Sequence, residues 1–130
     1  MAFIPAYKHE TAPVPFEYYP AGAIQNLEPG TLLYLNAGKL AVAGGTVKPQ
    51  FIAQHTGTID GTQVIAVEKI KESTIYETTC SADFTSVKIG NKVTTDTNGL
   101  TVTATTTSGI ATVVGFDGTT VGSKVLVRFE

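Results

Sequence analysis

Charged residues are scarce in this sequence. They make up 15% of its 130 residues, whereas 42% of the residues are hydrophobic. These fractions are typical of a globular protein, and the length has room for one domain. Because few charges are left to solvate an extensive free surface, we expect part of the surface to face a partner. The alternative is that Thr and Ser side chains provide the solvation.

Clusters of basic residues and long apolar runs are missing as well. The net charge is −2 and no group of Lys or Arg stands together. Nucleic-acid binding needs such groups to contact phosphates, so nucleic acid is not an expected partner. Without an 18-residue apolar run, no membrane span is predicted. Residues 1–5 lack the basic and apolar stretches of a signal peptide, so we expect a protein that is made in the cytoplasm and stays there until assembly or lysis.

Residues that carry catalysis or bind metals are few. His9 and His55 are the only histidines, and neither has a partner at metal-ligand spacing. The single cysteine, Cys80, excludes an intrachain disulfide framework and is interpreted as a small buried side chain. No phosphate-binding or catalytic motif is present. The sequence therefore predicts no enzyme, no metal and no cofactor, although two carboxylates that meet in space, as in glycosidases, stay an open alternative.

The first part of the chain combines proline with large apolar side chains. Four of the six prolines lie in the first twenty residues. Because proline removes a backbone donor and restricts the residue before it, residues 1–26 can form neither a useful helix nor a central strand. We predict an extended arm over 1–26 that binds a partner; the alternative is an arm that wraps over its own domain. The candidate binding residues are Phe3, Ile4, Pro5, Tyr7, Phe16, Tyr18 and Tyr19.

From residue 27 onward the pattern changes to short β-prone runs separated by turns. The sequence holds 21 Thr and 13 Gly, which suit pleated strands and tight turns. No window of a dozen residues repeats apolar positions at helical spacing. We expect one all-β domain over 27–130, a small β-barrel or β-sandwich with an extended N-terminal arm. The expected strands are 31–35, 39–43, 51–54, 63–70, 74–80, 87–89, 92–95, 100–105, 110–116 and 124–129.

Several turns and one strand carry specific signals. Asn36-Ala37-Gly38 and Asn98-Gly99 predict hairpins, and Asp60, Asp96 and Asp117 are explained by turn chemistry alone. In the last strand, alternation predicts that Val125, Val127 and Phe129 share one face.

The order of several short motifs resembles a known family. The motifs are Pro29-Gly30-Thr31-Leu32-Leu33-Tyr34-Leu35, Gly38-Lys39-Leu40, Asp60-Gly61 before Val64-Ile65-Ala66-Val67, Gly90-Asn91-Lys92-Val93, Gly109-Ile110-Ala111-Thr112-Val113-Val114-Gly115 and Gly122-Ser123-Lys124-Val125-Leu126-Val127. Together they resemble the head decoration (capsid cement) proteins of tailed bacteriophages. Extra β-structure follows the part shared with the shortest members.

This resemblance implies a β-tulip-like domain that forms homotrimers on the outer surface of the phage head. Such a protein binds the major capsid protein after the shell expands, bridges its subunits and uses the arm to do so. On this basis we expect that residues 2–20 can be removed without unfolding the domain. The alternative is another virion or surface module, such as a tail, fibre or glycan-binding adhesin domain, with Phe51, Tyr76 and Phe84 as the candidate aromatic contacts.

Overall fold

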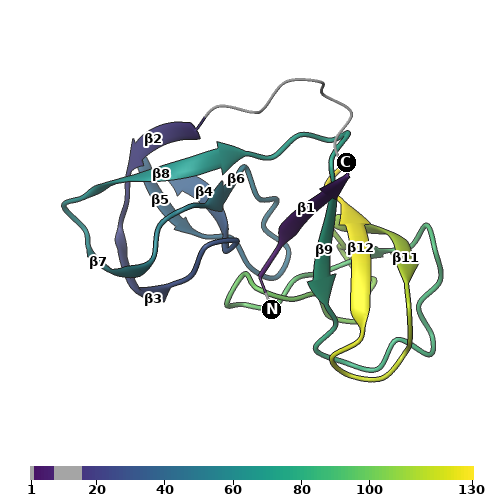
Figure 1. Ribbon diagram of the computed structural model, residues 1–130. Helices are drawn as coiled ribbons and strands as arrows, with labels where there is room; N and C mark the ends of the chain where they lie inside the picture. The colour runs from purple at the N-terminus through teal and green to yellow at the C-terminus, as the bar shows by residue number, and fades with distance from the viewer. Residues whose placement is uncertain (1, 8–15) are drawn as a thin grey trace.

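The computed structural model describes residues 2–7 and 16–130, and in this part the chain forms twelve β-strands and no helix. The strands make two five-stranded antiparallel sheets and a two-stranded ribbon. The two large sheets lie at opposite ends of the molecule (Figure 1). The all-β prediction is confirmed. Met1 and the 8–15 stretch of the predicted arm, which includes His9, lie outside the described residues.

The first sheet contains the second strand of the chain at one edge. Its order is β2 (Phe16–Pro20), β8 (Val64–Lys69), β6 (Phe51–Ala53), β4 (Leu32–Asn36) and β5 (Lys39–Val42). The ribbon, β3 (Ala23–Leu27) and β7 (Gly57–Asp60), continues from it. A core of apolar side chains that includes Leu33, Leu40 and Val67 belongs to this half of the molecule.

The second sheet contains the first strand and the last strand of the chain. Its order is β1 (Ile4–Tyr7), β9 (Ile75–Thr79), β12 (Lys124–Arg128), β11 (Ala111–Phe116) and β10 (Lys92–Val93). In β12, Val125 and Val127 are fully buried while Lys124 is exposed, and Phe129 is buried as well. The alternation predicted for this strand is confirmed.

Neither large sheet closes into a barrel within the described residues. In the first sheet, the edge strands β2 and β5 are joined only by a bridge between Ala21 and Leu40. After this bridge the chain enters β3, which belongs to the ribbon. In the second sheet, the edge strand β10 has two residues, which is too short to pair along a closing seam. The barrel form of the prediction is therefore wrong.

The hairpin predicted at residues 36–38 is confirmed. β4 and β5 pair up to Asn36 and Lys39, so Ala37 and Gly38 form a two-residue loop. Both loop residues have positive φ, 53° and 82°, which is the backbone of a type I′ turn.

The chain also reverses at Asn98-Gly99, but the strand predicted after it does not form. Residues 100–105 form no strand, although an isolated bridge joins Thr95 to Val102 and the Thr103 N–H donates to the Thr94 carbonyl at 3.0 Å. Side chains bond the backbone and one another here: the Thr101 hydroxyl donates to the Asp96 carboxylate, and the Thr103 hydroxyl oxygen accepts from the Thr105 N–H. Such local bonds compete with a regular ladder.

The strand predicted at 87–89 is likewise replaced by turns. The N–H of Val87 donates to the Phe84 carbonyl, and the N–H of Lys88 donates to the Asn91 side chain. Val87 is nevertheless buried, so its apolar character was a correct sign of the core but not of a strand.

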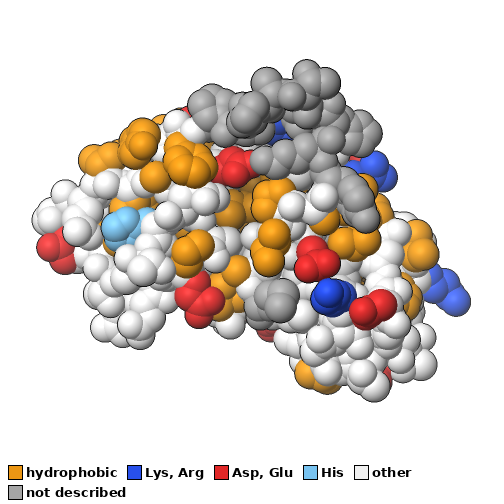
Figure 2. Space-filling model, in the orientation of Figure 1, with side chains coloured by type: hydrophobic (Ala, Val, Ile, Leu, Met, Phe, Trp, Pro, Cys, Tyr) orange, Lys and Arg blue, Asp and Glu red, His pale blue; other side chains and the backbone are white. Residues whose placement is uncertain are grey.

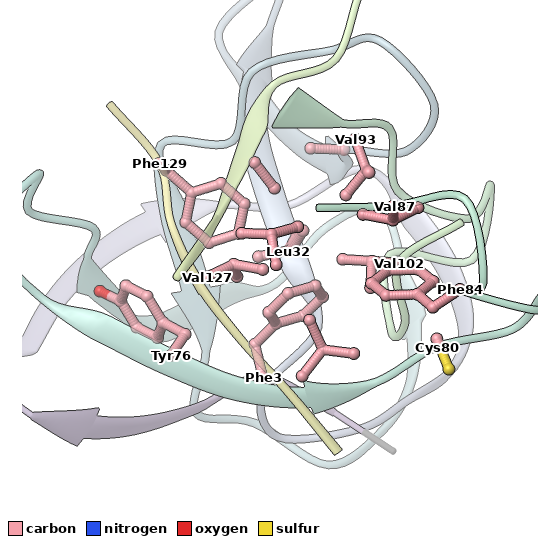
Figure 3. Close-up of a cluster of buried hydrophobic side chains, with 14 of the residues drawn as sticks. Phe3, Leu32, Tyr76, Cys80, Phe84, Val87, Val93, Val102, Val127 and Phe129 are labelled. Atoms are coloured by element: carbon pink, nitrogen blue, oxygen red, sulfur yellow. The ribbon is translucent and has the colours of Figure 1, made fainter. Parts of the chain in front are cut away.

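The largest apolar core joins the two sheets. It combines Leu32 of the first sheet with Tyr76 and Val127 of the second, and Cys80 is buried within it as the sequence predicts. Figure 3 shows Phe3 among these side chains. Its ring centroid lies 5.5 Å from that of Phe129. The N-terminal segment thus contributes directly to the core.

Gly30 allows this segment to lie close to the first sheet. Its φ is +89°, and a methyl group there would lie 2.5 Å from the Ala2 Cβ and 2.8 Å from the Phe3 carbonyl oxygen. We expect Gly30→Ala to lower the free energy of unfolding by about 2–5 kcal/mol, from backbone strain together with overpacking. Gly38→Ala is a matched control, because its φ is +82° but nothing lies within 4 Å. Thermal unfolding that shows equal losses for both variants would contradict the close contact.

Candidate functional site

The described part of the predicted arm pairs with the chain's own sheets. β1 is the edge strand beside β9, with Ile4 opposite Glu77. β2 is the edge strand beside β8, with Tyr18 opposite Ala66. Both elements are edge strands, which agrees with the expectation that proline keeps this segment out of sheet centres. In this conformation, residues 2–7 and 16–20 lie against the β domain.

The candidate residues before the gap differ in exposure. Phe3 is 1% exposed and its N–H donates to the Gly30 carbonyl at 3.0 Å, so its side chain faces the chain's own core. Ile4 is 48% exposed, and Pro5 is half-buried. Tyr7 is placed by its pairing with Ile75 in β1. Ile4 therefore presents an apolar side chain to a partner, whereas Phe3 does not.

The candidate residues after the gap alternate between two sides of β2. Phe16 and Tyr18 are 51% and 66% exposed. Tyr19 points the other way: its ring centroid lies 4.9 Å from that of Phe51, and its hydroxyl donates to a Glu17 carboxylate oxygen at 2.6 Å. That hydrogen bond raises the pKa of the Tyr19 phenol. Tyr18 and Tyr19 therefore lie on opposite sides of β2.

Exposed apolar side chains continue from β2 onto β8. The register places Tyr18 opposite Ala66 and Pro20 opposite Val64, so these side chains share one face. Val64 is 62% exposed. We call this surface the outer face; its apolar residues are Phe16, Tyr18, Pro20, Val64 and Ala66, and Glu68 lies opposite Phe16 on the same face. Figure 2 shows hydrophobic side chains gathered over β2 and β8.

The outer face is large enough to count among the main apolar patches of a small protein. Large aromatic side chains carry about 150–250 Å² each, so the exposed fractions of Phe16, Tyr18 and Val64 sum to about 300–400 Å². The largest apolar patch on a monomeric protein is of this order and is often functional. The sequence analysis missed Val64; apolar residues on both faces of the strand from Val64 to Val67 were the available signal.

A groove of about 610 Å³ lies on the other side of β2. Glu17 and Tyr19 of β2 line it, together with Tyr34 of β4 and Phe129 at the end of the chain. The two sides of β2 therefore carry different surfaces, the outer face on one and this groove on the other.

Within residues 2–7 and 16–130, no three or more His, Cys, Asp or Glu side chains are placed to hold a metal ion. Asp60 accepts bonds from the Thr62 N–H and hydroxyl, and Asp117 accepts from the Lys124 N–H at 3.1 Å. These bonds confirm the turn roles predicted for both residues. No helix long and apolar enough to cross a membrane occurs among the described residues.

The chain was compared with known proteins. No protein-family model matches it, and no curated protein shows significant similarity to its sequence. The outer face, the groove and the motif resemblance are therefore the features that bear on function.

Proposed function

We propose that the chain is a capsid decoration protein, which binds the outer surface of a phage head, bridges subunits of the major capsid protein and stabilises the expanded shell. The observation that carries this proposal is the outer face, an uncovered apolar surface at a sheet edge. Burying such a surface against a partner is favourable by about 25 cal/mol per Å² of apolar area. The exposed Ile4 on β1 adds a second apolar contact.

Three aromatic side chains were the candidate glycan contacts of the adhesin alternative, and their burial favours the capsid proposal over that alternative. Phe51, Tyr76 and Phe84 are 5%, 2% and 0% exposed. Side chains this deeply buried offer no flat surface for a glycan. The exposed aromatic rings at the outer face come instead from β2, the segment that the resemblance assigns to capsid binding.

The resemblance also leads us to propose the assembly and the finer fold. The protein forms a homotrimer on the outer capsid surface of the virion, and its partner is the major capsid protein. Its two large sheets are an open, sandwich-like variant of the β-tulip domain. The low charged fraction, 15%, supports an assembly in which part of the surface is covered.

Decoration is tested by mixing the purified protein with expanded, undecorated capsids of the phage that encodes it. We expect co-sedimentation at a fixed ratio, and electron cryomicroscopy should show threefold density on the outer surface. Unexpanded shells are the control, because the proposed partner surface forms on expansion. Protein that stays in the supernatant with both kinds of shell would contradict the proposal, as would density for single copies away from the threefold axes.

A further inference from the structure

The groove beside β2 has a lining that suits recognition of a small polar ligand. Its aromatic walls are formed by Tyr19 and Tyr34, which are half-buried, and the buried Phe51 supports Tyr19 from within the core. Ligand sites commonly have a volume of about 300–1,000 Å³ and combine aromatic walls with a few polar groups. At about 610 Å³, the groove falls within that range.

Among the residues that the structure describes, the charges around the groove balance. Two carboxylates, Glu17 and Glu72, and two ammonium groups, Lys48 and Lys69, line it. The Lys48 Nζ lies 3.9 Å from a Glu72 carboxylate oxygen, so one pair already offsets itself. An anion such as a phosphate would meet both carboxylates, and a cation would meet both ammonium groups. This lining therefore favours a ligand without net charge.

Three backbone N–H groups in the groove wall already donate hydrogen bonds within the chain, so they cannot pair with an added peptide strand. The Leu35 N–H donates to the Gln50 side-chain oxygen at 2.8 Å. The Gln50 N–H donates to the Leu33 carbonyl and the Ile70 N–H donates to the Gln50 carbonyl, each at 2.9 Å. Strand addition depends on free backbone groups. At these positions, a ligand in the groove would be contacted by side chains and not by backbone donors.

We propose that the groove binds a neutral saccharide. The C–H face of a sugar ring packs on Tyr19 and Tyr34, and its hydroxyls bond to the carboxylate of Glu17 and the ammonium group of Lys69. Carboxylates accept and ammonium groups donate, so together they serve hydroxyls in both senses. This function is additional to capsid binding, because the outer face lies on the opposite side of β2.

The test begins with an array of neutral and acidic oligosaccharides probed with the labelled full-length chain. The strongest neutral oligosaccharide is then titrated into ¹⁵N-labelled protein and followed by NMR. We expect chemical-shift changes around Tyr19, Tyr34 and Lys69. Tyr34→Ala should weaken binding by about tenfold, as expected for loss of a central aromatic contact. Lys69→Ala alters an exposed side chain and should weaken binding in the same direction while keeping the fold.

The matched control is Tyr18→Ala, one residue from Tyr19 but on the outer face. It should leave saccharide binding unchanged and weaken capsid binding, whereas Lys69→Ala should do the reverse. The saccharide proposal is overturned if no neutral oligosaccharide binds, if the shifts map away from the groove, or if a proline-rich peptide binds there in place of sugars. None of these results bears on capsid co-sedimentation, so the two proposals fail separately.

Discussion

Replacing Phe3 by Ala is expected to lower the free energy of unfolding by about 3–5 kcal/mol, the usual cost of removing a buried phenyl ring. Phe3 is 1% exposed and packs with Phe129 in the core that joins the sheets. The loss is measured by urea denaturation of the purified protein. A midpoint that falls without a change in slope would show that stability itself has changed.

Ile4 provides the matched control for this measurement. It is the next residue in the chain but is 48% exposed. Ile4→Ala should therefore change the free energy of unfolding by less than about 1 kcal/mol. Equal losses for the two variants would contradict the burial of Phe3 as the cause.

The structure also changes what a truncation should do. Removing residues 2–20 deletes Phe3, β1 and β2, and so exposes the edges of β9 and β8. We now expect this truncation to unfold or aggregate, whereas the sequence alone suggested a soluble domain. Point variants of exposed residues are consequently the better test of capsid binding.

The second large effect is expected from the outer face. The double variant Phe16→Ala, Tyr18→Ala removes its two aromatic rings, which are 51% and 66% exposed. Central aromatic contacts often contribute 2 kcal/mol or more to binding, so apparent affinity for expanded capsids should fall by about thirtyfold or more. In a trimer the loss is larger, because avidity multiplies affinity by about 10²–10⁴. Quantitative co-sedimentation measures it.

A control with equally exposed apolar residues is available in the second half of the molecule. Ile89 and Val121 are 69% and 65% exposed and lie in turns of that half. The variant Ile89→Ala, Val121→Ala should bind capsids like the unaltered protein. If this control loses binding and the β2 variant keeps it, the docking surface lies elsewhere on the chain.

Local patterns predicted much of the β structure. The hairpin at Ala37-Gly38 was indicated by Gly38, which adopts positive φ freely, although Ala37 also takes a positive φ there. The alternation in β12 reflects the period of a strand that has one face in the core. Both signals are contained within a few consecutive residues, which is why sequence reasoning found them.

Pairing between distant segments could not be read in the same way. In residues 2–7 and 16–26 the chain forms neither a helix nor a central strand of a large sheet, as the prolines predicted, but nothing near Phe3 or Tyr18 indicates that β1 pairs with β9 or β2 with β8. The opposite directions of Tyr18 and Tyr19 follow only once β2 is known to be a strand. Val64 was missed for the same reason, since its exposure depends on which face of β8 remains uncovered.

The contact between Phe3 and Phe129 has a consequence for how the protein comes to be folded in the cell. These two residues stand near opposite ends of the sequence, and β1 completes its sheet only beside strands that are synthesised much later. During translation, β1 can pair with β9 only once residues 75–79 have left the ribosome, and Phe3 can contact Phe129 only after residue 129 has been made. Closing so long a loop is slow. The second sheet is therefore complete only after β12, its last strand in the sequence, has been synthesised.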